Sequence, residues 1–336
     1  MSLTQKLIND GNAAVDEMLA GIMAAHPDHL WRPDHAPRAA VAKNGPRPGK
    51  VAIVVGGGSG HEPTFLGYVG KGLADACAVG NVFASPPPQP AVDAALAANG
   101  GAGVLFLYGN YAGDVMNFDM ASELLEMEGV EVRTVLTTDD IASAPRDQRE
   151  KRRGVAGNVF IFKAAGAAAD LMMPIDEVER VARHANDRTF TMGVALSSCS
   201  LPQTRRPSFD LPMGEMEIGM GIHGEPGVRR GPLRTANEVV DEIMDAILAE
   251  MNAPAGDRVA VLVNSLGSTP LMELYIMNAR VAERLRSAGL TVHRTLVGPY
   301  CTSLEMAGAS ITVMHLDDEL QRLLDHPCDC AMFRQG

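Results

Sequence analysis

Short apolar runs alternate with amphipathic stretches along the first half of the chain. Apolar runs of this length predict buried strands, whereas apolar residues spaced three or four positions apart predict helices. The runs predict strands at 51–55, 103–108 and 130–136, and the amphipathic stretches predict helices at 90–98, 118–128, 159–172 and 175–186. Strands that alternate with helices in this order favour a mostly parallel sheet with right-handed crossovers.

The second half has a similar alternation after an irregular start. It opens with a predicted strand at 191–197 and a segment at 205–227 that is rich in proline, glycine and methionine. An amphipathic helix at 236–251, a strand at 258–264 and a turn into a helix at 267–286 follow. Since 336 residues exceed one comfortable core, we expect an α/β protein with two domains, 1–190 and 191–336, and mostly parallel or mixed sheets. The 19 methionines fall mostly at helical or strand-core spacing, so no cofactor is needed to explain them.

Charge and hydropathy restrict the class of partner. The net charge of -12 and the lack of any basic run longer than 151–153 argue against nucleic acids and anionic membranes. We interpret that short basic run as a solvated turn. No window approaches the roughly 18 consecutive apolar residues of a membrane span, and the N-terminus has no apolar signal core. We therefore expect a cytoplasmic protein.

The cysteines do not predict a disulfide framework, because the five of them are odd in number and scattered. Cys328 and Cys330 form the one close pair, with His326 beside them. Their spacing differs from that of the usual zinc ligands, so we expect no metal and interpret this end of the chain as a frayed tail.

Three consecutive glycines follow the first predicted strand in the sequence VAIVVGGGSGHEP, residues 51–63. A dinucleotide-binding fingerprint requires a further glycine where this chain has His61 or Pro63, and a phosphate-binding loop requires a lysine that is missing between 51 and 70. These differences argue against a nucleotide on this chain and against a dinucleotide-dependent oxidoreductase. A glycine-rich strand end can still hold a small ligand, since no Cβ shields its backbone N–H groups. The alternative is an ordinary glycine turn with a surface histidine.

Three glycine-containing stretches carry titratable groups. They place His61 in 58–63, Asp114 in 109–114 and His223 in 221–227. Two imidazoles and a carboxylate on flexible backbone suit acid–base or nucleophilic chemistry on a compact polar substrate. The turns at 264–267 and 300–303 either line a groove or start helices. We interpret the remaining histidines as polar-segment or packing residues: His26, His29, His35, His184, His293 and His315.

Several motifs then carry a family resemblance. GGGSGHEP, GNYAGDVMNF, RRGVAGN, ALSSCSLP, PSFDLP, EMEIGMGIHGEPG, NSLGSTPLMELY and GPYCTSLEMAG occur in this order between about Lys6 and Asp318. Together they resemble the dihydroxyacetone kinase family, in particular its substrate-binding subunit K. The resemblance implies two α/β domains, a homodimer, and a ketone held as a covalent hemiaminal on His223. It implies that His61 and Asp114 are the other catalytic residues, and that the substrate contacts are Gly58, Ser59, Gly60, His61, Gly109 and Asp114.

The chain departs from the family pattern in one motif. Members of the family commonly read Lys-Asn-Tyr-Thr-Gly-Asp where this chain has Gly109 and Ala112 in place of the lysine and the threonine. The family's lysine position is a substrate contact, which Gly109 can keep only through its backbone. A changed pocket could accept a four-carbon ketose such as erythrulose in place of dihydroxyacetone.

The resemblance also implies partners, because family enzymes need an all-helical, nucleotide-binding L unit. No such unit follows in this sequence, so we expect a separate L subunit that carries ATP, or ADP with Mg, and no nucleotide on this chain. The phosphoryl donor is then ATP itself or a phosphotransferase-system relay through an M subunit. The alternative is a non-catalytic, ketose-binding regulatory protein that uses the same fold to dock on a partner.

Overall fold

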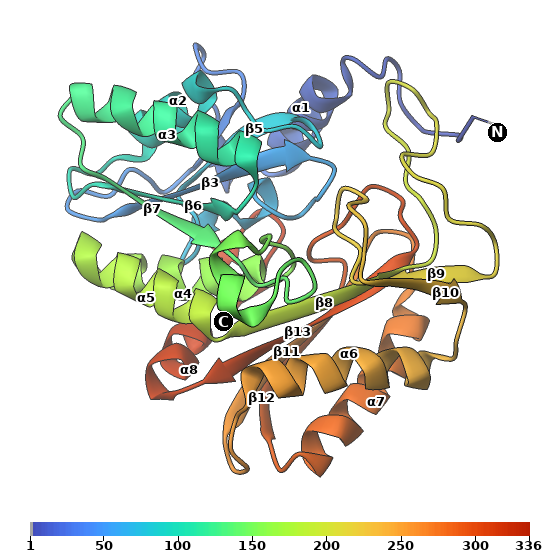
Figure 1. The fold of residues 1–336 in the computed structure, drawn as a ribbon. Coiled ribbons are helices and arrows are strands. Elements are labelled where there is room, and N and C mark those ends of the chain that lie inside the picture. Colours follow the sequence, from blue (N-terminus) through green and yellow to red (C-terminus); the bar gives the residue numbers. More distant parts are fainter. Residues whose placement is uncertain (1–2) are drawn as a thin grey trace.

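Two six-stranded mixed sheets and the helices that cover them make up the fold (Figure 1). The structure is a computed structural model and describes residues 3–336. The first sheet has the order β1 (Leu30–Trp31), β2 (Ala39–Ala42), β5 (Ala76–Val82), β3 (Ala52–Ser59), β6 (Val104–Gly109) and β7 (Val132–Thr137). The second has the order β10 (Arg229–Pro232), β9 (Glu215–Ile218), β8 (Thr189–Ala195), β13 (Gly308–Leu316), β11 (Arg258–Ser265) and β12 (Thr291–Gly298).

The pairing differs between the two sheets. Strands β5, β3, β6 and β7 run parallel, as the β-α-β pattern predicts, and β1 and β2 add an antiparallel edge. In the second sheet only β11 and β12 are parallel, whereas β13 pairs antiparallel with both β11 and β8. The expected α/β class with mixed sheets is confirmed.

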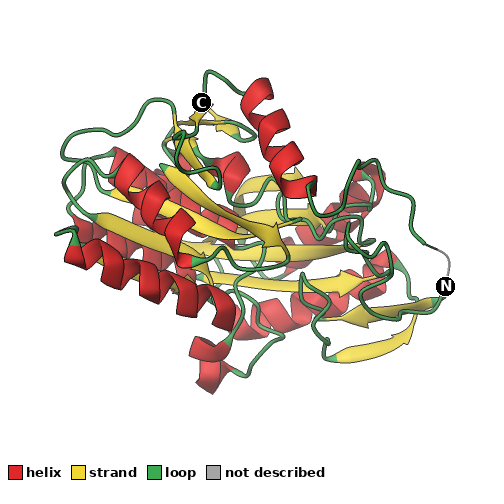
Figure 2. Ribbon diagram, turned by 90° about the horizontal axis from the view of Figure 1, so that it is seen from above, coloured by secondary structure: helices red, strands yellow, loops and turns green. Residues whose placement is uncertain are grey.

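The helices and sheets stack in layers (Figures 1 and 2). Helices α2 and α3 cover one face of the first sheet, α4, α5 and α8 lie between the two sheets, and α6 and α7 cover the outer face of the second. The helices are α1 (Ala14–Ala25), α2 (Pro88–Ala98), α3 (Ala112–Met127), α4 (Asn158–Asp170), α5 (Ile175–Asp187), α6 (Ala236–Met251), α7 (Leu271–Ser287) and α8 (Asp318–Asp325). Two short 3-10 helices span Leu66–Tyr68 and Arg146–Lys151.

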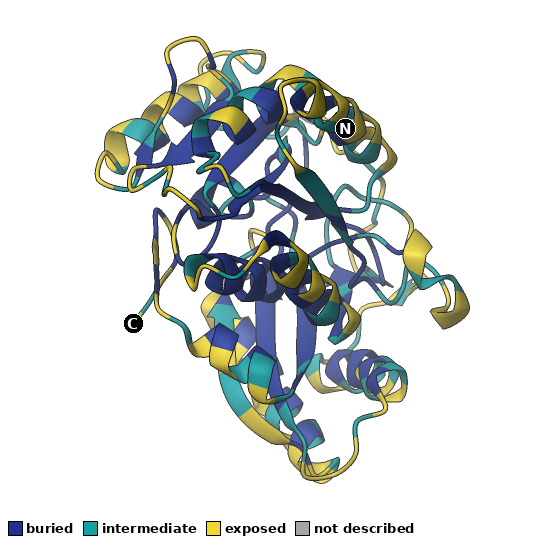
Figure 3. Ribbon diagram, turned by 90° about the vertical axis from the view of Figure 1, so that its left-hand side faces the viewer, coloured by how far each residue is buried: buried dark blue, intermediate teal, exposed yellow. Residues whose placement is uncertain are grey.

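Helix α4 is the centre of the molecule, and every residue from Asn158 to Ala169 is buried (Figure 3). Its small residues permit this, because a Cβ at Gly166 would lie 2.4 Å from the backbone of Leu73. Strand β11 is buried on both faces as well. Since successive side chains point to opposite faces, Leu262 packs into the core around α4, while Val261 packs into the core under α6 and α7.

The C-terminal residues return to the first half of the chain. Strand β14 (Cys328–Cys330) pairs with β4 (Gly70–Lys71) and with β15 (Arg334–Gln335). The expected frayed tail is therefore wrong, because backbone pairing orders this segment and buries both cysteines. The second sheet begins at Thr189, close to the predicted boundary, but the division into domains 1–190 and 191–336 stays a prediction.

Several local predictions differ from the structure. Helix α3 begins at Ala112 and not near residue 118, because its first turn is small and polar and lacks an apolar period. The run 151–153 is not a solvated turn: Arg152 is buried and its Nη1 donates to Glu250 Oε1 at 3.0 Å. A charged side chain can be buried when an opposite charge pairs with it. Glu250 lies 98 positions away in the sequence, so the local pattern did not show this partner. In the part of the chain described, no helix is long and apolar enough to cross a membrane.

Candidate active site

The candidate residues meet where loops from both sheets converge. His61 follows β3 of the first sheet, and His223 lies in the turn that joins β9 and β10 of the second. Their Nε2 atoms are 2.9 Å apart. Asp114 lies in the first turn of α3, directly after β6. Ligands of open α/β sheets bind outside the carboxyl ends of the strands, which is where His61 and Asp114 lie.

His61 is a buried, neutral imidazole. It is 1% exposed, and its ring stacks on Phe83 with the centroids 4.9 Å apart. Burial, followed by the charge of His223, lowers the pKa of His61 to about 3. Its Nδ1 lies 2.8 Å from the carbonyl oxygen of Thr302. Because a carbonyl oxygen only accepts, Nδ1 carries the hydrogen and Nε2 is left as an acceptor.

His223 is fixed by a carboxylate two residues away. Its Nδ1 lies 2.9 Å from Glu225 Oε1, and its backbone N–H donates to Oε2 at 3.0 Å. Burial alone would raise the pKa of Glu225, but the hydrogen bond and charge of His223 outweigh it and lower that pKa to about 2. Glu225 is therefore a carboxylate at neutral pH. Arg153 approaches it to 3.7 Å and is itself held by Asp140.

The two imidazoles share a proton. Both Nδ1 atoms face oxygens that only accept, so both carry hydrogen, and two bare Nε2 atoms would repel each other at 2.9 Å. One further proton must lie between the Nε2 atoms. His61 is buried and resists protonation, whereas His223 has the Glu225 carboxylate beside its Nδ1. The two rings are therefore joined by one N–H···N hydrogen bond of 2.9 Å.

Asp114 has a raised pKa and, within residues 3–336, one buried oxygen without a hydrogen-bond partner. Burial raises its pKa to about 6, against smaller lowering effects of Ser85 and His223. Its Oδ1 is buried, and no residue within 3–336 gives it a hydrogen bond. A buried acceptor without a partner is costly in a folded protein, so such atoms mark places where a ligand can bind. A substrate hydroxyl would satisfy it.

The glycines near His61 matter mainly because a larger residue would not fit at their positions. Gly56 and Gly57 lie inside β3 and not in a loop, and Gly60 alone in 56–60 has a positive φ, of 101°. A Cβ at Gly58 would lie 2.7 Å from the backbone nitrogen of Ala84. The Ser59 hydroxyl donates to Gly80 O at 2.8 Å, so its side chain is engaged within the fold.

Gly109 does not leave an open space in the structure. A Cβ there would lie 3.1 Å from the carbonyl oxygen of Gly154 and 3.1 Å from the ring of Tyr111. That ring stands edge-on to His223, with centroids 4.8 Å apart. The side chain of Tyr111 thus occupies space next to Gly109, and the cation of this region is Arg153.

Sequence reasoning missed part of the site. Of the two alternatives for the turn at 300–303, the helix start is wrong, because Thr302 lies in a loop whose backbone carbonyl reaches His61. Arg153 was assigned to a solvated turn, although it contacts Asp140 and Glu225. The spacing of Glu225, two residues after His223, was the one available signal. Asp114 was expected on flexible backbone, and the start of α3 fixes it instead.

Comparison with known proteins identifies the family of the chain. The family model described as the Dak1 domain matches residues 20–332. The chain belongs to the dihydroxyacetone kinase family. It is 51% identical over 330 residues to the dihydroxyacetone-binding subunit DhaK of PTS-dependent dihydroxyacetone kinase 2 from Listeria innocua, covering 98% of this chain and 99% of that protein. It is 44% identical to the L-erythrulose kinase of Pectobacterium atrosepticum, covering 98% of this chain but 56% of that protein.

Solved structures of two different kinds resemble the fold. The dihydroxyacetone kinase of C. freundii superposes with a TM-score of 0.91 at 33% identity, covering 99% of this chain and 61% of that one. The dihydroxyacetone kinase operon co-activator DhaQ superposes with a TM-score of 0.88, also at 33% identity, over 95% of this chain and 98% of that one. Since a kinase and a co-activator resemble the chain almost equally well, the fold does not separate catalysis from regulation.

Proposed function

We propose that this chain is the ketose-binding subunit of a dihydroxyacetone kinase, and that it holds the ketone as a covalent hemiaminal on His223. The observation that carries the proposal is the contact of the two Nε2 atoms at 2.9 Å, with an acceptor fixed behind each ring. This arrangement holds a nucleophile and an acid together. The likeness to a dihydroxyacetone-binding subunit over nearly the whole of both chains supports the same substrate class.

The histidine pair can supply both the nucleophile and the proton that the addition to the ketone requires. The shared proton moves to His61 Nε2, which frees the lone pair on His223 Nε2. That nitrogen bonds to the carbonyl carbon, the C=O π electrons move to oxygen, and His61 gives its proton to that oxygen. The positive charge returns to the alkylated His223 ring, beside the Glu225 carboxylate. A ketone can react in this way and glycerol cannot, so the bond itself selects the substrate.

Asp114 then serves the phosphoryl transfer. Its unpartnered Oδ1 would accept the proton of a terminal hydroxyl as that oxygen attacks the donor phosphate. The donor would be ATP with Mg on a separate L subunit, where it would either bind as ATP or form when an M subunit of a phosphotransferase system phosphorylates bound ADP. The Listeria relative is PTS-dependent by name, which supports the relay over free ATP.

The rate should depend on the charge of Asp114. Its pKa is raised to about 6, so the carboxylate that accepts a proton is lost as the pH falls through 6. We expect kcat/KM for the ketose, at saturating L subunit, to be level above about pH 7 and to fall about tenfold per pH unit below about pH 6. A break near pH 4, as for an ordinary aspartate, would contradict this assignment.

Glu225 should stabilise the adduct. The variant Glu225→Gln keeps an acceptor for His223 Nδ1 but removes the charge that balances the alkylated ring. Hydrogen bonds to charged groups contribute about 1.5–3 kcal/mol, so we expect the ketose dissociation constant to rise about tenfold or more. Calorimetric titration measures it. The control Glu215→Gln, a half-exposed carboxylate paired with Arg230, should change it less than twofold. Equal constants for the two variants would argue against the role.

Two other functions are supported by particular observations. Relatives named erythrulose kinases are 44% identical, and Gly109 and Ala112 differ from the usual motif, so a four-carbon ketose is a second candidate substrate. The likeness to a co-activator supports a ketose-sensing protein. Ketose phosphorylation measured with a purified L-type subunit separates these functions. Turnover supports the kinase and its relative rates give the substrate, whereas adduct formation without turnover supports the sensor.

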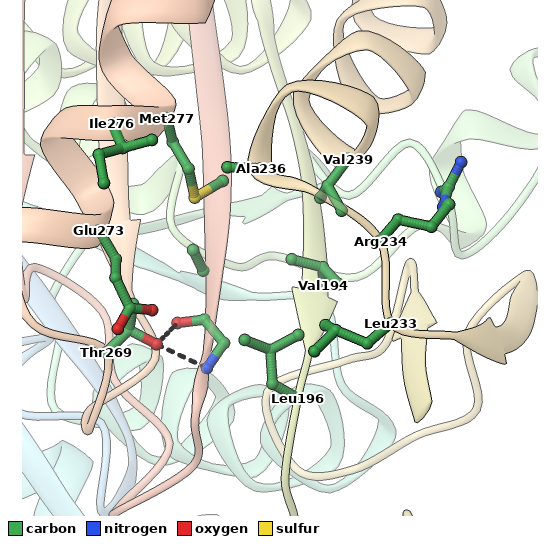
Figure 4. Close-up of a pocket in the computed structure, with 12 residues that line it drawn as sticks. Val194, Leu196, Leu233, Arg234, Ala236, Val239, Thr269, Glu273, Ile276 and Met277 are labelled. Carbon is green, nitrogen blue, oxygen red and sulfur yellow. Dashed lines mark hydrogen bonds between the residues drawn. The ribbon is translucent and has the colours of Figure 1, made fainter. Parts of the chain in front are cut away.

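The family resemblance also leads us to propose that the chain forms a homodimer. One surface supports it: an apolar hollow of about 250 Å³ lies between α6 and α7 on the outer side of the second sheet (Figure 4). Exposed Ile276 and Leu233 line it, and Leu271, Met272 and Tyr275 are further exposed apolar residues of α7. Large exposed apolar patches mark interaction sites, and this one contains none of the candidate catalytic groups. Sedimentation equilibrium of the intact chain tests it. The cytoplasmic location stays an expectation from the sequence.

A further inference from the structure

The outer face of helix α3 carries an apolar stripe that the fold does not use. Met116, Met120, Leu124 and Met127 are 61%, 51%, 42% and 84% exposed. Their spacing of four, four and three residues places them on one side of the helix, while Phe118, Ala121 and Leu125 pack on the opposite side against the first sheet. The methionines of this stripe lie at helical spacing, but their side chains are exposed and do not pack into the core.

A row of acidic residues runs beside the stripe. Asp119, Glu123 and Glu126 are exposed and, within residues 3–336, form no ion pair. Other surface helices differ, since Glu179 on α5 pairs with Arg183 and Glu283 on α7 pairs with Arg280. Helix α3 contains no lysine or arginine. Unpaired acids next to exposed methionines favour a partner that brings basic side chains to an apolar contact.

The stripe starts at the candidate active site. Asp114 lies in the first turn of the same helix, after exposed Ala112 and Gly113, and Met116 is the next exposed residue. Helix α3 lies on the outer side of the first sheet, so a bound protein would meet no other layer (Figure 1). A protein that carries a phosphoryl donor to Asp114 would therefore contact α3. Small residues in the first turn permit a close approach.

We propose that the α3 stripe, Met116, Met120, Leu124 and Met127 with the acidic row beside it, is the docking surface for the phosphoryl-donor protein. The inference rests on the proposed function, because it names the surface of this chain that the phosphoryl-donor protein contacts. The occupant is a nucleotide-carrying subunit with an apolar face and a basic rim. A second copy of this chain fits poorly, because a symmetric contact through α3 would oppose two acidic rows. Methionine side chains adapt to a partner that binds, releases product and binds again.

A matched pair of variants tests the surface. Leu124→Glu places a charge in the stripe, and Leu171→Glu changes the same residue type, 43% exposed, at the end of α4 on the opposite side of the first sheet. The probe is a purified L-type subunit loaded with ADP and Mg. We expect Leu124→Glu to raise its dissociation constant more than tenfold and Leu171→Glu to change it less than twofold. Glu123→Lys should weaken binding at low salt and reduce the salt dependence.

The outcomes separate the surface from the proposed function. Ketose adduct formation by the chain alone should be the same in both leucine variants, because neither residue touches the site. Equal affinity of both variants for the L-type subunit would overturn the docking surface and leave the kinase function standing. A change from dimer to monomer in Leu124→Glu, measured by sedimentation, would overturn it in favour of a second copy. An intact chain that forms the adduct yet binds no L-type subunit would overturn both proposals.

Discussion

Replacing His223 by alanine removes ketose phosphorylation. We expect the rate at saturating L subunit to fall by about 10³-fold or more, the order lost when a substrate is no longer held in reach of its catalytic group. The loss follows from the geometry, since Nε2 of His223 is the nitrogen that faces His61 while its Nδ1 is fixed by Glu225. Coupled assay of ketose phosphate formation measures the rate.

The control for this variant is another histidine with a carboxylate partner. His184 on α5 pairs with Asp317 at 2.6 Å, far from the shared proton, so His184→Ala should keep the rate within about twofold. His223 lies in a partly exposed turn, and its removal should leave the melting temperature nearly unchanged. A His223→Ala protein that keeps a tenth of the rate would show that the ketose is held without the bond.

Replacing Asp114 by asparagine separates binding from transfer. The amide cannot accept the hydroxyl proton as a base, and general-base catalysis contributes about 10²–10⁴-fold. We expect phosphorylation to fall by that factor while the adduct forms as before, because the histidine pair is unchanged. Rate and adduct are measured on the same sample. Asn is nearly isosteric with Asp and removes a buried charge, so this variant should be at least as stable as the unmodified chain.

The matching control changes an aspartate on the neighbouring helix. Asp93 on α2 accepts a hydrogen bond from Gln89 at the surface, so Asp93→Asn should leave both rate and adduct unchanged. If Asp114→Asn instead abolished adduct formation, Asp114 would be a residue that binds the ketose. The division of roles between Asp114 and His61 would then have to be reversed.

Elements whose apolar residues recur at a regular spacing could be predicted from the sequence. Pairings and contacts between residues far apart in the chain could not. Helix α6 matches its prediction at 236–251, because its apolar residues recur at helical spacing and Thr235 caps it. Strand β13 was not predicted, although it is the antiparallel centre of the second sheet. Its β-branched run at 311–313 favours a strand, so only its antiparallel pairing with β8 and β11 was beyond the local sequence. The buried Arg152 was misassigned for the same reason.

The site was only partly accessible to the same reasoning. The glycines located His61 and His223, but the residues that set their protonation, Thr302 and Glu225, act through contacts that form on folding. Thr302 lies 241 positions from His61, so its carbonyl could not be assigned in advance. The bond to the ketone was inferred from family resemblance. The structure adds the contact of 2.9 Å between the two Nε2 atoms, on which the proposed addition step rests.

The most direct test of the central claim is a carbon NMR titration with ketose labelled at its carbonyl carbon, on protein labelled with ¹⁵N in its histidines. Dihydroxyacetone and erythrulose are run in parallel without any L subunit. We expect the carbonyl signal of the preferred ketose to move to an sp3 position and to show one-bond coupling to nitrogen, with His61→Asn slowing its appearance. A bound ketose whose carbonyl signal stays in the sp2 range, with no coupling to nitrogen, would contradict the account.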